Sequence, residues 1–372
     1  MSSKTLSVVQ LLPELNAGGV ERGTLEIANE LVKHGHRSIV ISGGGRLVDE
    51  LVSSGSEHIP LDVGKKSLLS LRLISYLRRY FDEEKIDIIH ARSRLPAWLT
   101  YLAWNKMDPA SRPKFITSVH GAYRVNRYSE IMTKGQNVIA TSNFIFKYIT
   151  NNYPTVDKNK ITLIHRGVSK TEFPFAFRPD EKWMKIWHEQ HPFLTDKFIL
   201  SLPARITRRK GHEDFLNILV KLRQQNIPVH GLIIGGAHSR KKNYLQELKE
   251  KSQALHLEDD ITFLGHRNDV KKIMSISNIV LSLSNEPESF GRTALEALCL
   301  GIPVIAYDHG GATEILTETY PVGRVELNNT TAVCNKVISF YNDPVPVADK
   351  NPFTLDKMLN ATLSLYSQSN NL

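Results

Sequence analysis

Cysteine and long apolar runs are scarce in this chain. Only Cys299 and Cys334 occur among the 372 residues, and their spacing fits neither a disulfide framework nor a zinc site. No stretch approaches the roughly 20 apolar residues of a membrane-spanning helix. The first apolar run, residues 6–12, is too short and too polar for a signal peptide. These absences predict a cytoplasmic protein without structural disulfides.

Acidic residues are under-represented in the first half of the chain. The net charge is +9, and residues 1–170 hold 24 lysines and arginines against 15 acidic residues, whereas residues 171–372 hold 23 of each. A basic half favours nucleic acid, anionic lipid or an acidic substrate as a partner. No known nucleic-acid-binding module occurs. We therefore expect no nucleic-acid partner and favour an acidic acceptor or an anionic membrane.

Short apolar runs alternate with longer helical patterns, which is typical of α/β proteins with doubly wound parallel sheets. The expected strands form two sets. The first covers residues 6–12, 38–42, 86–90, 114–119, 138–140 and 161–164, and the second covers residues 198–202, 231–234, 261–264, 279–282 and 303–306. Two such sets predict two Rossmann-like domains.

The expected domain boundaries follow from these two sets of strands and from the composition of the segment between them. We predict an N-terminal domain over residues 1–172 and a C-terminal domain over residues 193–351. Prolines and tryptophans concentrate in residues 173–192, which we interpret as the connecting segment. Apolar residues at helical spacing predict a final helix within residues 352–372.

A loop and helix late in the chain are typical of a phosphate site. The predicted helix over residues 293–300 follows a loop with Phe290 and Gly291, so free backbone N–H groups and the positive helix end face outward. Glu288 precedes the helix, and Glu296 lies within it, roughly 8 Å further along the axis at a rise of 1.5 Å per residue. Ionised carboxylates only accept hydrogen bonds, which suits sugar and ribose hydroxyls.

These residues resemble the donor-site motif of retaining glycosyltransferases of family 4, in which two glutamates are separated by seven residues, as here. The resemblance assigns Glu288 to the transferred sugar, Glu296 to the ribose, and backbone groups of Phe290 and Gly291 to the sugar and phosphate. It implies the GT-B fold, with two Rossmann-like domains facing across a cleft and a C-terminal helix that returns to the N-terminal domain. Further donor-binding residues implied by the resemblance are Arg292, Thr293, His266 and Arg267.

The loop after the first strand of the second set carries a basic motif. Ligands bind at the carboxyl ends of parallel strands, where Arg205 can grip a phosphate with two N–H groups and Lys210 can act as a point charge. The motif resembles the family's Gly-Arg-Leu…Lys-Gly pattern, which contacts the diphosphate, with Ala204 in place of the glycine. We expect Arg208 and Arg209 to be solvated.

Two motifs in the first half add to the predicted site. Gly18 and Gly19 follow the first expected strand, and the family's matching Gly-Gly-x-Glu-Arg loop closes over the donor. His120 has the position of the family's histidine that faces the donor sugar near its O6. Arg166-Gly167 resembles the turn that ends the N-terminal domain, where many members carry Asn-Gly, and we interpret it as architectural.

Residues 67–81 form a predicted amphipathic helix. Its apolar face is expected to pack on the sheet. Its basic residues, Arg72, Arg78 and Arg79, could contact anionic lipid, at about 1 kcal/mol for each basic residue at the surface. The alternative is that these residues form an ordinary solvated face. The chain is predicted to be cytoplasmic, and the first alternative would place it at the inner face of the cytoplasmic membrane.

The predicted activity is transfer of a sugar, with retention, from a UDP- or GDP-sugar to a glycan or glycolipid acceptor in lipopolysaccharide or other surface-polysaccharide synthesis. Arg205, Lys210 and the helix N-terminus would stabilise the departing diphosphate. No Asp-x-Asp motif occurs, so no metal and no further cofactor is expected. The alternatives are an epimerase or hydrolase of the same fold and a sugar-nucleotide-binding protein without catalysis. Donor turnover with and without an acceptor would distinguish them.

Overall fold

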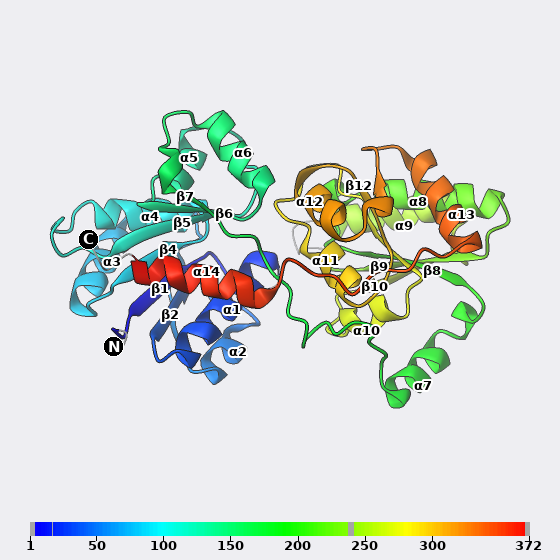
Figure 1. Cartoon of the computed structure of the whole chain (residues 1–372), viewed down its shortest axis with the longest axis horizontal. Coiled ribbons are helices and arrows are strands. Elements are labelled where there is room, and N and C mark those ends of the chain that lie inside the picture. Colours follow the sequence, from blue (N-terminus) through cyan, green and yellow to red (C-terminus); the bar gives the residue numbers. More distant parts are fainter. Residues whose placement is uncertain (1–3, 17, 237–241, 369–372) are drawn as a thin grey trace. The chain divides into compact units, whose positions relative to one another are not determined.

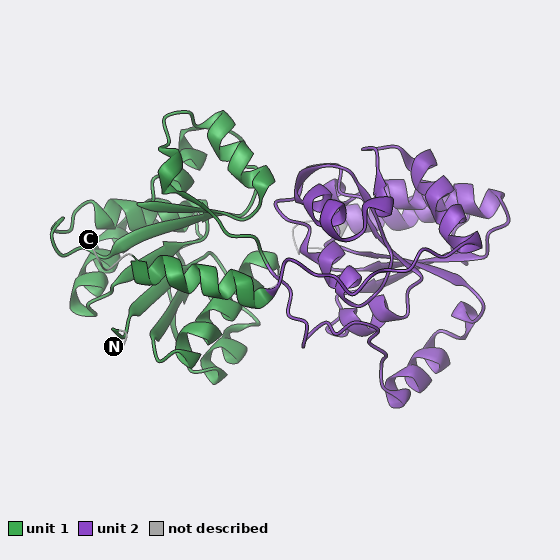
Figure 2. Ribbon diagram, viewed as in Figure 1, with its two compact units in different colours: residues 1–166, 355–372 green, residues 167–354 purple. Residues whose placement is uncertain are grey.

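The computed structural model describes residues 4–16, 18–236 and 242–368 of the chain (Figure 1). These residues form two compact units, which are described separately (Figure 2). Unit 1 comprises residues 1–166 and 355–372, and unit 2 comprises residues 167–354. Each unit has a parallel sheet with helices on its faces, so the predicted pair of Rossmann-like domains is confirmed.

Unit 1 is built on a parallel sheet in the order β3-β2-β1-β4-β5-β6-β7. Its strands are β1 (Ser7–Leu11), β2 (Arg37–Ser42), β3 (Glu57–Pro60), β4 (Ile88–Ala91), β5 (Lys114–Val119), β6 (Asn137–Ala140) and β7 (Ile161–Leu163). Its α-helices are α1 (Gly19–Lys33), α2 (Val48–Ser53), α3 (Arg72–Glu83), α4 (Arg94–Trp104), α5 (Arg127–Glu130), α6 (Asn143–Asn152) and α14 (Leu355–Ser367).

Unit 2 has a parallel sheet in the order β10-β9-β8-β11-β12-β13. Its strands are β8 (Phe198–Pro203), β9 (Val229–Ile234), β10 (Ile261–Gly265), β11 (Ile279–Ser282), β12 (Val304–Tyr307) and β13 (Arg324–Val325). Its α-helices are α7 (Glu181–Gln190), α8 (His212–Gln224), α9 (Lys242–Ala254), α10 (Val270–Ser275), α11 (Arg292–Cys299), α12 (Gly310–Thr319) and α13 (Thr330–Asn342).

The central strands of unit 1 are mostly buried because both faces of the sheet are covered. Val8 of β1 packs in one cluster with Ile27 of α1 and Leu359 of α14. Its neighbour Val9 points to the other face and packs in a cluster with Leu77 of α3. Figure 1 shows α14 lying beside α1, and the Tyr366 hydroxyl of α14 lies 2.6 Å from Nδ1 of the buried His90.

Two edge strands are missing from the sequence prediction. β3 lies at the edge of the unit 1 sheet, its two end residues are exposed and its two middle residues are half-buried, so it lacks an apolar run. β13 lies at the edge of the unit 2 sheet and has only two residues. Edge strands are covered on fewer sides, so their composition carries a weak signal.

The observed unit boundaries differ from the predicted ones. The first segment of unit 1 ends at Arg166, and residues 173–192 lie within unit 2. In that stretch, α7 buries Trp187, which is 3% exposed and packs with Leu232 of β9. The tryptophans that suggested a connecting segment instead anchor this helix to the sheet of unit 2.

The predicted helix over residues 67–81 is divided in the structure. A 3₁₀ turn, Leu68–Leu71, precedes α3. Helix α3 buries Ile74, Leu77 and Phe81. In the 3₁₀ turn, Leu69 is 65% exposed.

Among the described residues, no helix is both long enough and apolar enough to cross a membrane.

Candidate functional site

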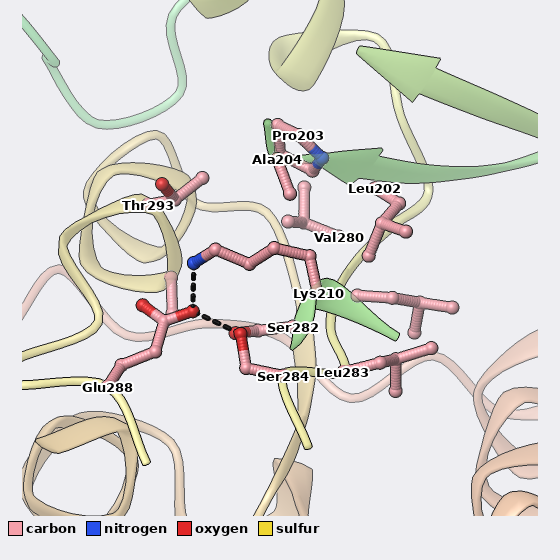
Figure 3. Close-up of a pocket in the computed structure, with 12 residues that line it drawn as sticks. Leu202, Pro203, Ala204, Lys210, Val280, Ser282, Leu283, Ser284, Glu288 and Thr293 are labelled. Carbon is pink, nitrogen blue, oxygen red and sulfur yellow. Dashed lines mark hydrogen bonds and ion pairs between the residues drawn. The ribbon is translucent and has the colours of Figure 1, made fainter. Parts of the chain in front are cut away.

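A pocket lies in unit 2 at the carboxyl ends of β8 and β11. Residues 202–204 and 280–284 line it together with Lys210, Glu288 and residues 293–294 (Figure 3). β8 is the strand from which the chain order runs outward in both directions, to β9 and β10 on one side and to β11 and β12 on the other. Open α/β sheets bind ligands at such a topological switch point. We refer to this cavity as the β8–β11 pocket.

The polar centre of the β8–β11 pocket is an ion pair. Lys210 Nζ lies 2.5 Å from Glu288 Oε1, and the Ser284 hydroxyl donates to the same oxygen (Figure 3). Burial by itself would raise the pKa of Glu288, but the Lys210 ammonium, aided by Ser284 and His309, outweighs burial and holds the pKa below its usual value. Glu288 is therefore ionised at neutral pH, and both of its side-chain hydrogen bonds to described residues are made by Oε1.

A glycine fixes the position of Lys210. The chain forms a 3₁₀ turn, Arg208–Lys210, and then adopts a left-handed conformation at Gly211, with φ 70°. A Cβ at Gly211 would lie 2.6 Å from the Cβ of Leu283. The segment after β11 therefore packs directly on the backbone that follows Lys210. This close approach explains why glycine follows the lysine.

The loop that carries Glu288 is held by packing on both sides. Phe290 is 2% exposed, and its ring packs edge-on against Phe353 with centroids 5.6 Å apart. The N–H of Gly311 donates to the Glu288 carbonyl at 2.8 Å. Gly291 precedes α11 with φ 87°, a left-handed conformation that favours glycine. The Phe290 side chain is thus structural, and the first N–H groups of α11 lack acceptors within the helix.

Glu296 does not line the β8–β11 pocket. Its Oε1 accepts a hydrogen bond from Arg292 Nε at 2.8 Å, one turn earlier in α11. Both side chains are largely buried. Thr293, in contrast, does line the pocket (Figure 3). Of the predicted residues on this helix, the structure brings only Thr293 to Lys210 and Glu288.

The basic residues of the loop after β8 have different environments. Arg208 pairs with Glu247, and Arg209 pairs with Glu286 at 3.2 Å. Both side chains are exposed to solvent, as expected, at 63% for Arg208 and 60% for Arg209, and each also belongs to a surface ion pair. Arg205 is exposed and makes no recorded ion pair in the described part of the chain. It remains the unpaired cation at the carboxyl end of β8.

His266 and Arg267 lie in a second surface hollow, which shares no lining residue with the β8–β11 pocket. Two N–H groups of Arg267 bind Asp269, at 2.8 and 2.6 Å. Asp269 also accepts a hydrogen bond from Trp183 Nε1 at 2.9 Å. This pairing with Asp269 raises the pKa of Arg267 above its ordinary value. The structure therefore does not bring Arg267 to the ion pair of Lys210.

Sequence reasoning missed two glycines that join these hollows. Gly235 and Gly236 follow β9 directly. Gly235 donates its N–H to the Gly265 carbonyl at 2.8 Å, and a Cβ on Gly235 would lie 2.7 Å from the carbonyl carbon of Ala204. The carboxyl ends of β8, β9 and β10 are packed backbone to backbone. A Gly-Gly pair after a predicted parallel strand was the available signal.

Ser284 and His309 were also missed. His309 Nε2 donates to the Ser284 carbonyl at 2.5 Å, which supports the segment that carries the serine hydroxyl. Both residues stand two positions beyond a strand of the predicted sheet, β11 for Ser284 and β12 for His309. Their position just beyond the carboxyl ends of parallel strands was the sequence signal that could have identified them as site residues.

In the described part of the chain, no three His, Cys, Asp or Glu side chains are grouped as metal ligands would be.

The remaining predicted residues lie in unit 1. Gly18 precedes α1, and Gly19 is its first residue. Arg166 donates to the Gly19 carbonyl, and its Nη1 lies 3.4 Å from His120 Nδ1. Burial, and after it the charges of Arg92 and Arg166, hold the pKa of His120 well below its ordinary value, so this imidazole is neutral. The structure therefore links Gly19 and His120 through one arginine.

Comparison with known proteins agrees with the fold and the motifs. The model described as Glycosyl transferases group 1 matches residues 184–351, and that described as Glycosyltransferase Family 4 matches residues 17–172. N-acetyl-alpha-D-glucosaminyl L-malate synthase of Bacillus anthracis is 24% identical over 346 residues, which cover 89% of this chain and 86% of the relative.

Solved structures extend this similarity to the whole chain. A glycosyltransferase from Rickettsia africae ESF-5 is 32% identical, with a TM-score of 0.86, over 99% of this chain and 100% of the other. HepE of Anabaena, solved in complex with UDP-glucose, is 19% identical, with a TM-score of 0.76, over 98% of this chain and 95% of the other. With both halves matched by family models and a full-length relative above 30% identity, the chain belongs to the family 4 glycosyltransferases of GT-B architecture.

Proposed function

We propose that this glycosyltransferase moves a sugar, with retention of anomeric configuration, from a UDP- or GDP-sugar to a glycan or glycolipid acceptor. The observation that carries the proposal is the Lys210–Glu288 ion pair, 2.5 Å long, at the switch point of the unit 2 sheet. A cation there suits a diphosphate, and an ionised carboxylate suits sugar hydroxyls. The UDP-glucose complex of the Anabaena relative supports a nucleotide-sugar donor.

In the proposed mechanism, the residues of unit 2 stabilise the leaving group. Lys210 and Arg205 offset the charge that develops on the diphosphate as the bond to the sugar carbon breaks. The N-terminus of α11, which begins after Gly291, adds backbone N–H donors and a partial positive charge. Glu288 keeps one oxygen on Lys210 and presents the other to the sugar. Thr293, which lines the same pocket, donates its hydroxyl to the phosphate.

Bond making and breaking then balance on one face of the sugar. The acceptor hydroxyl oxygen forms the new bond to the anomeric carbon as the bond to the diphosphate oxygen breaks. The departing diphosphate oxygen takes the acceptor proton, so no further base is required. Neither a divalent ion nor a cofactor beyond the nucleotide sugar enters these steps.

The donor's remaining contacts in this proposal come from residues outside the β8–β11 pocket. Glu296 accepts from the ribose hydroxyls, with Arg292 holding its carboxylate in place. His266 and Arg267 lie beside the base. His120, Gly18 and Gly19, which belong to unit 1, complete the set of residues that we propose for donor binding.

We further propose that the acceptor belongs to lipopolysaccharide or another surface glycan and is met at the inner face of the cytoplasmic membrane. Arg72, Arg78 and Arg79 of α3 are exposed and make no recorded ion pair in the described part of the chain. The 3₁₀ turn that directly precedes α3 adds Leu69 and Leu71, which are also exposed. Basic and apolar groups together suit an anionic lipid surface.

The deciding experiment is donor turnover with and without acceptor. Purified protein is incubated with UDP- and GDP-sugars, alone and with a lipid-linked glycan extract, and the released nucleotide and the transferred sugar are measured separately. Transfer that requires the extract, with retained configuration, supports the proposal. Nucleotide release without an acceptor would favour a hydrolase or epimerase. Tight donor binding without either product would favour a non-catalytic binding protein.

A further inference from the structure

Arg166 is a buried charged residue at the boundary of unit 1. It is 6% exposed and is the last residue of the first segment of that unit. Its Nη2 donates to the Gly19 carbonyl at the start of α1. Its Nη1 lies 3.4 Å from Nδ1 of His120, which follows β5. Arg166 therefore connects Gly19 and His120, which are far apart in the sequence. A residue that served only its own turn would not make these two contacts.

The contact with Arg166 specifies one tautomer of His120. A guanidinium has N–H donors and no acceptor, so the Nδ1 atom that faces it must be the unprotonated nitrogen of a neutral imidazole. The proton of His120 is then on Nε2. Within the described residues, Nε2 is buried and has no hydrogen-bond partner. Buried N–H groups are rarely left unpaired, so this atom is suited to a ligand oxygen.

The neighbouring charges keep this tautomer neutral. The charged and titratable groups around His120 are Arg92 and His90 from β4 and its end, together with Arg166. Burial contributes most to lowering the pKa of His120, and the two arginines add to it. His90 is buried and itself neutral, because burial, with Arg92, holds its pKa well below the ordinary value. A protonated His120 would place a third positive charge beside the two guanidinium groups.

We infer that Arg166 is a positioning residue that directs the Nε2–H of His120 to an oxygen of the donor sugar while it fixes the carbonyl of Gly19. The inference rests on the proposed function, because it takes the sugar of the nucleotide-sugar donor as the ligand. It corrects the interpretation of Arg166 as part of an architectural turn. A shorter amide side chain such as asparagine could not make the same pair of contacts from this backbone position.

The first turns of α1 leave room for this arginine. A Cβ built on Gly23 would lie 2.9 Å from Cζ of Arg166 and closer still to Nη2. Glycine inside a helix ordinarily destabilises it by roughly 0.5–1 kcal/mol relative to alanine. Its presence at position 23 is explained by the space that the guanidinium occupies. Gly23→Ala therefore offers a way to displace the guanidinium without changing its charge.

The test is the tautomer of His120, read by ¹⁵N NMR of the imidazole nitrogens in the full-length protein. The chain has 14 histidines, so the His120 signals are assigned by comparison with His120→Gln. We expect protonated Nε2 and unprotonated Nδ1 in the unaltered protein, and a mixture of tautomers in both Arg166→Met and Gly23→Ala. The pKa of His120 should rise in Arg166→Met because one positive charge is removed, and Arg166→Lys should retain most of the original tautomer.

Activity provides the second readout. Arg166→Met and Gly23→Ala should each lower kcat/KM by about 10- to 100-fold, the usual range for one misplaced buried hydrogen bond. The low-pH limb of the rate profile should move to higher pH in Arg166→Met. In the Arg166→Met background, Gly23→Ala should cost little, since the guanidinium that it displaces is gone.

The outcomes separate this inference from the proposed function. Protonated Nδ1 in the unaltered protein, or an unchanged tautomer in both Arg166→Met and Gly23→Ala, would overturn the role of Arg166 whatever the activity. The predicted change of tautomer in a protein that transfers no sugar would keep the link between Arg166 and His120 and would overturn the proposed transferase instead. If Arg166→Met fails to fold, Gly23→Ala still decides the matter.

Discussion

Removing the ammonium of Lys210 should turn Glu288 from a stabilising group into a destabilising one. The two atoms are 2.5 Å apart, and about a quarter of each side chain is exposed, 27% for Lys210 and 24% for Glu288. Breaking a fully buried pair costs about 3–5 kcal/mol, and this partial exposure reduces the expected cost of Lys210→Ala to roughly 2–3 kcal/mol at pH 7. The carboxylate left behind keeps only the Ser284 hydroxyl on the same oxygen.

The pH dependence follows from the direction of the pKa shift. In the unaltered protein, the pKa of Glu288 lies below 4.5, so the pair stabilises the fold above that pH and the stabilisation is lost as pH falls through the lowered pKa. Without Lys210, burial dominates and raises the pKa of Glu288 above 4.5. The difference in the free energy of unfolding should therefore be largest near neutral pH and should shrink in acid, where both proteins carry a neutral Glu288.

The assay must follow unit 2 alone, because unfolding of two units need not be a single transition. The four tryptophans divide evenly: Trp98 and Trp104 lie in unit 1, and Trp183 and Trp187 lie in unit 2. Replacing the first two by phenylalanine leaves fluorescence that reports unit 2 during urea unfolding.

The matched control is the double variant Lys210→Met with Glu288→Gln, which removes both charges. It should recover most of the stability lost in Lys210→Ala, since no charge is left unpaired. A coupling energy between the two positions below about 0.5 kcal/mol, the scatter expected for independent sites, would refute this reasoning. Lys210→Ala should in addition reduce transfer by about 100-fold, because its charge faces the leaving group in the proposed mechanism.

Three further predictions concern the proposed reaction. Glu288→Gln should mainly lower kcat and Glu296→Gln should mainly raise KM for the donor, because the sugar changes charge in the transition state and the ribose does not; losses confined to KM in both variants would contradict this division. Dialysis against a chelator should leave transfer unchanged, and activity restored only by added Mg²⁺ or Mn²⁺ would reject the metal-free mechanism. Binding to anionic vesicles should fall as the Debye length shrinks from about 30 Å to about 8 Å, and the triple change of Arg72, Arg78 and Arg79 to glutamine should weaken it without altering donor binding. Vesicle binding that changes neither with salt concentration nor with the triple glutamine substitution would favour a soluble acceptor.

The central strands were predictable because their signal is local. β1, β5, β8 and β11 are buried on both faces, and short segments in which most residues are apolar or small suffice to predict them. The same reasoning fails for β3, where half of the residues face solvent. It also fails for residues 173–192, because a tryptophan in a linker and a tryptophan that anchors a helix have the same sequence signature. Only the contact of Trp187 with β9 distinguishes the two.

The site was predictable where a residue type itself carries the chemistry. Lys210 and Glu288 are charged residues at strand ends, and the structure joins them directly. The residues that support this ion pair could not be predicted from their type, because Ser284 and His309 are ordinary polar residues in the sequence. They come beside Glu288 only where β11 and β12 end next to each other in the sheet. The engagement of Glu296 with Arg292 was foreseeable from their spacing of four along a helix.

Helix α14 makes unit 1 discontinuous, and this has a consequence for synthesis. The ribosome finishes β1 to β7 long before it makes Met358 and Tyr366, yet those residues complete the apolar cluster that contains Leu6 and Ile116. Until then α1 covers this face of the unit 1 sheet without α14, and His90 lacks the hydroxyl that meets its Nδ1. Unit 1 is therefore the first unit to leave the ribosome and the last to be completed. A chain truncated before α14 should expose an apolar surface that chaperones and proteases recognise.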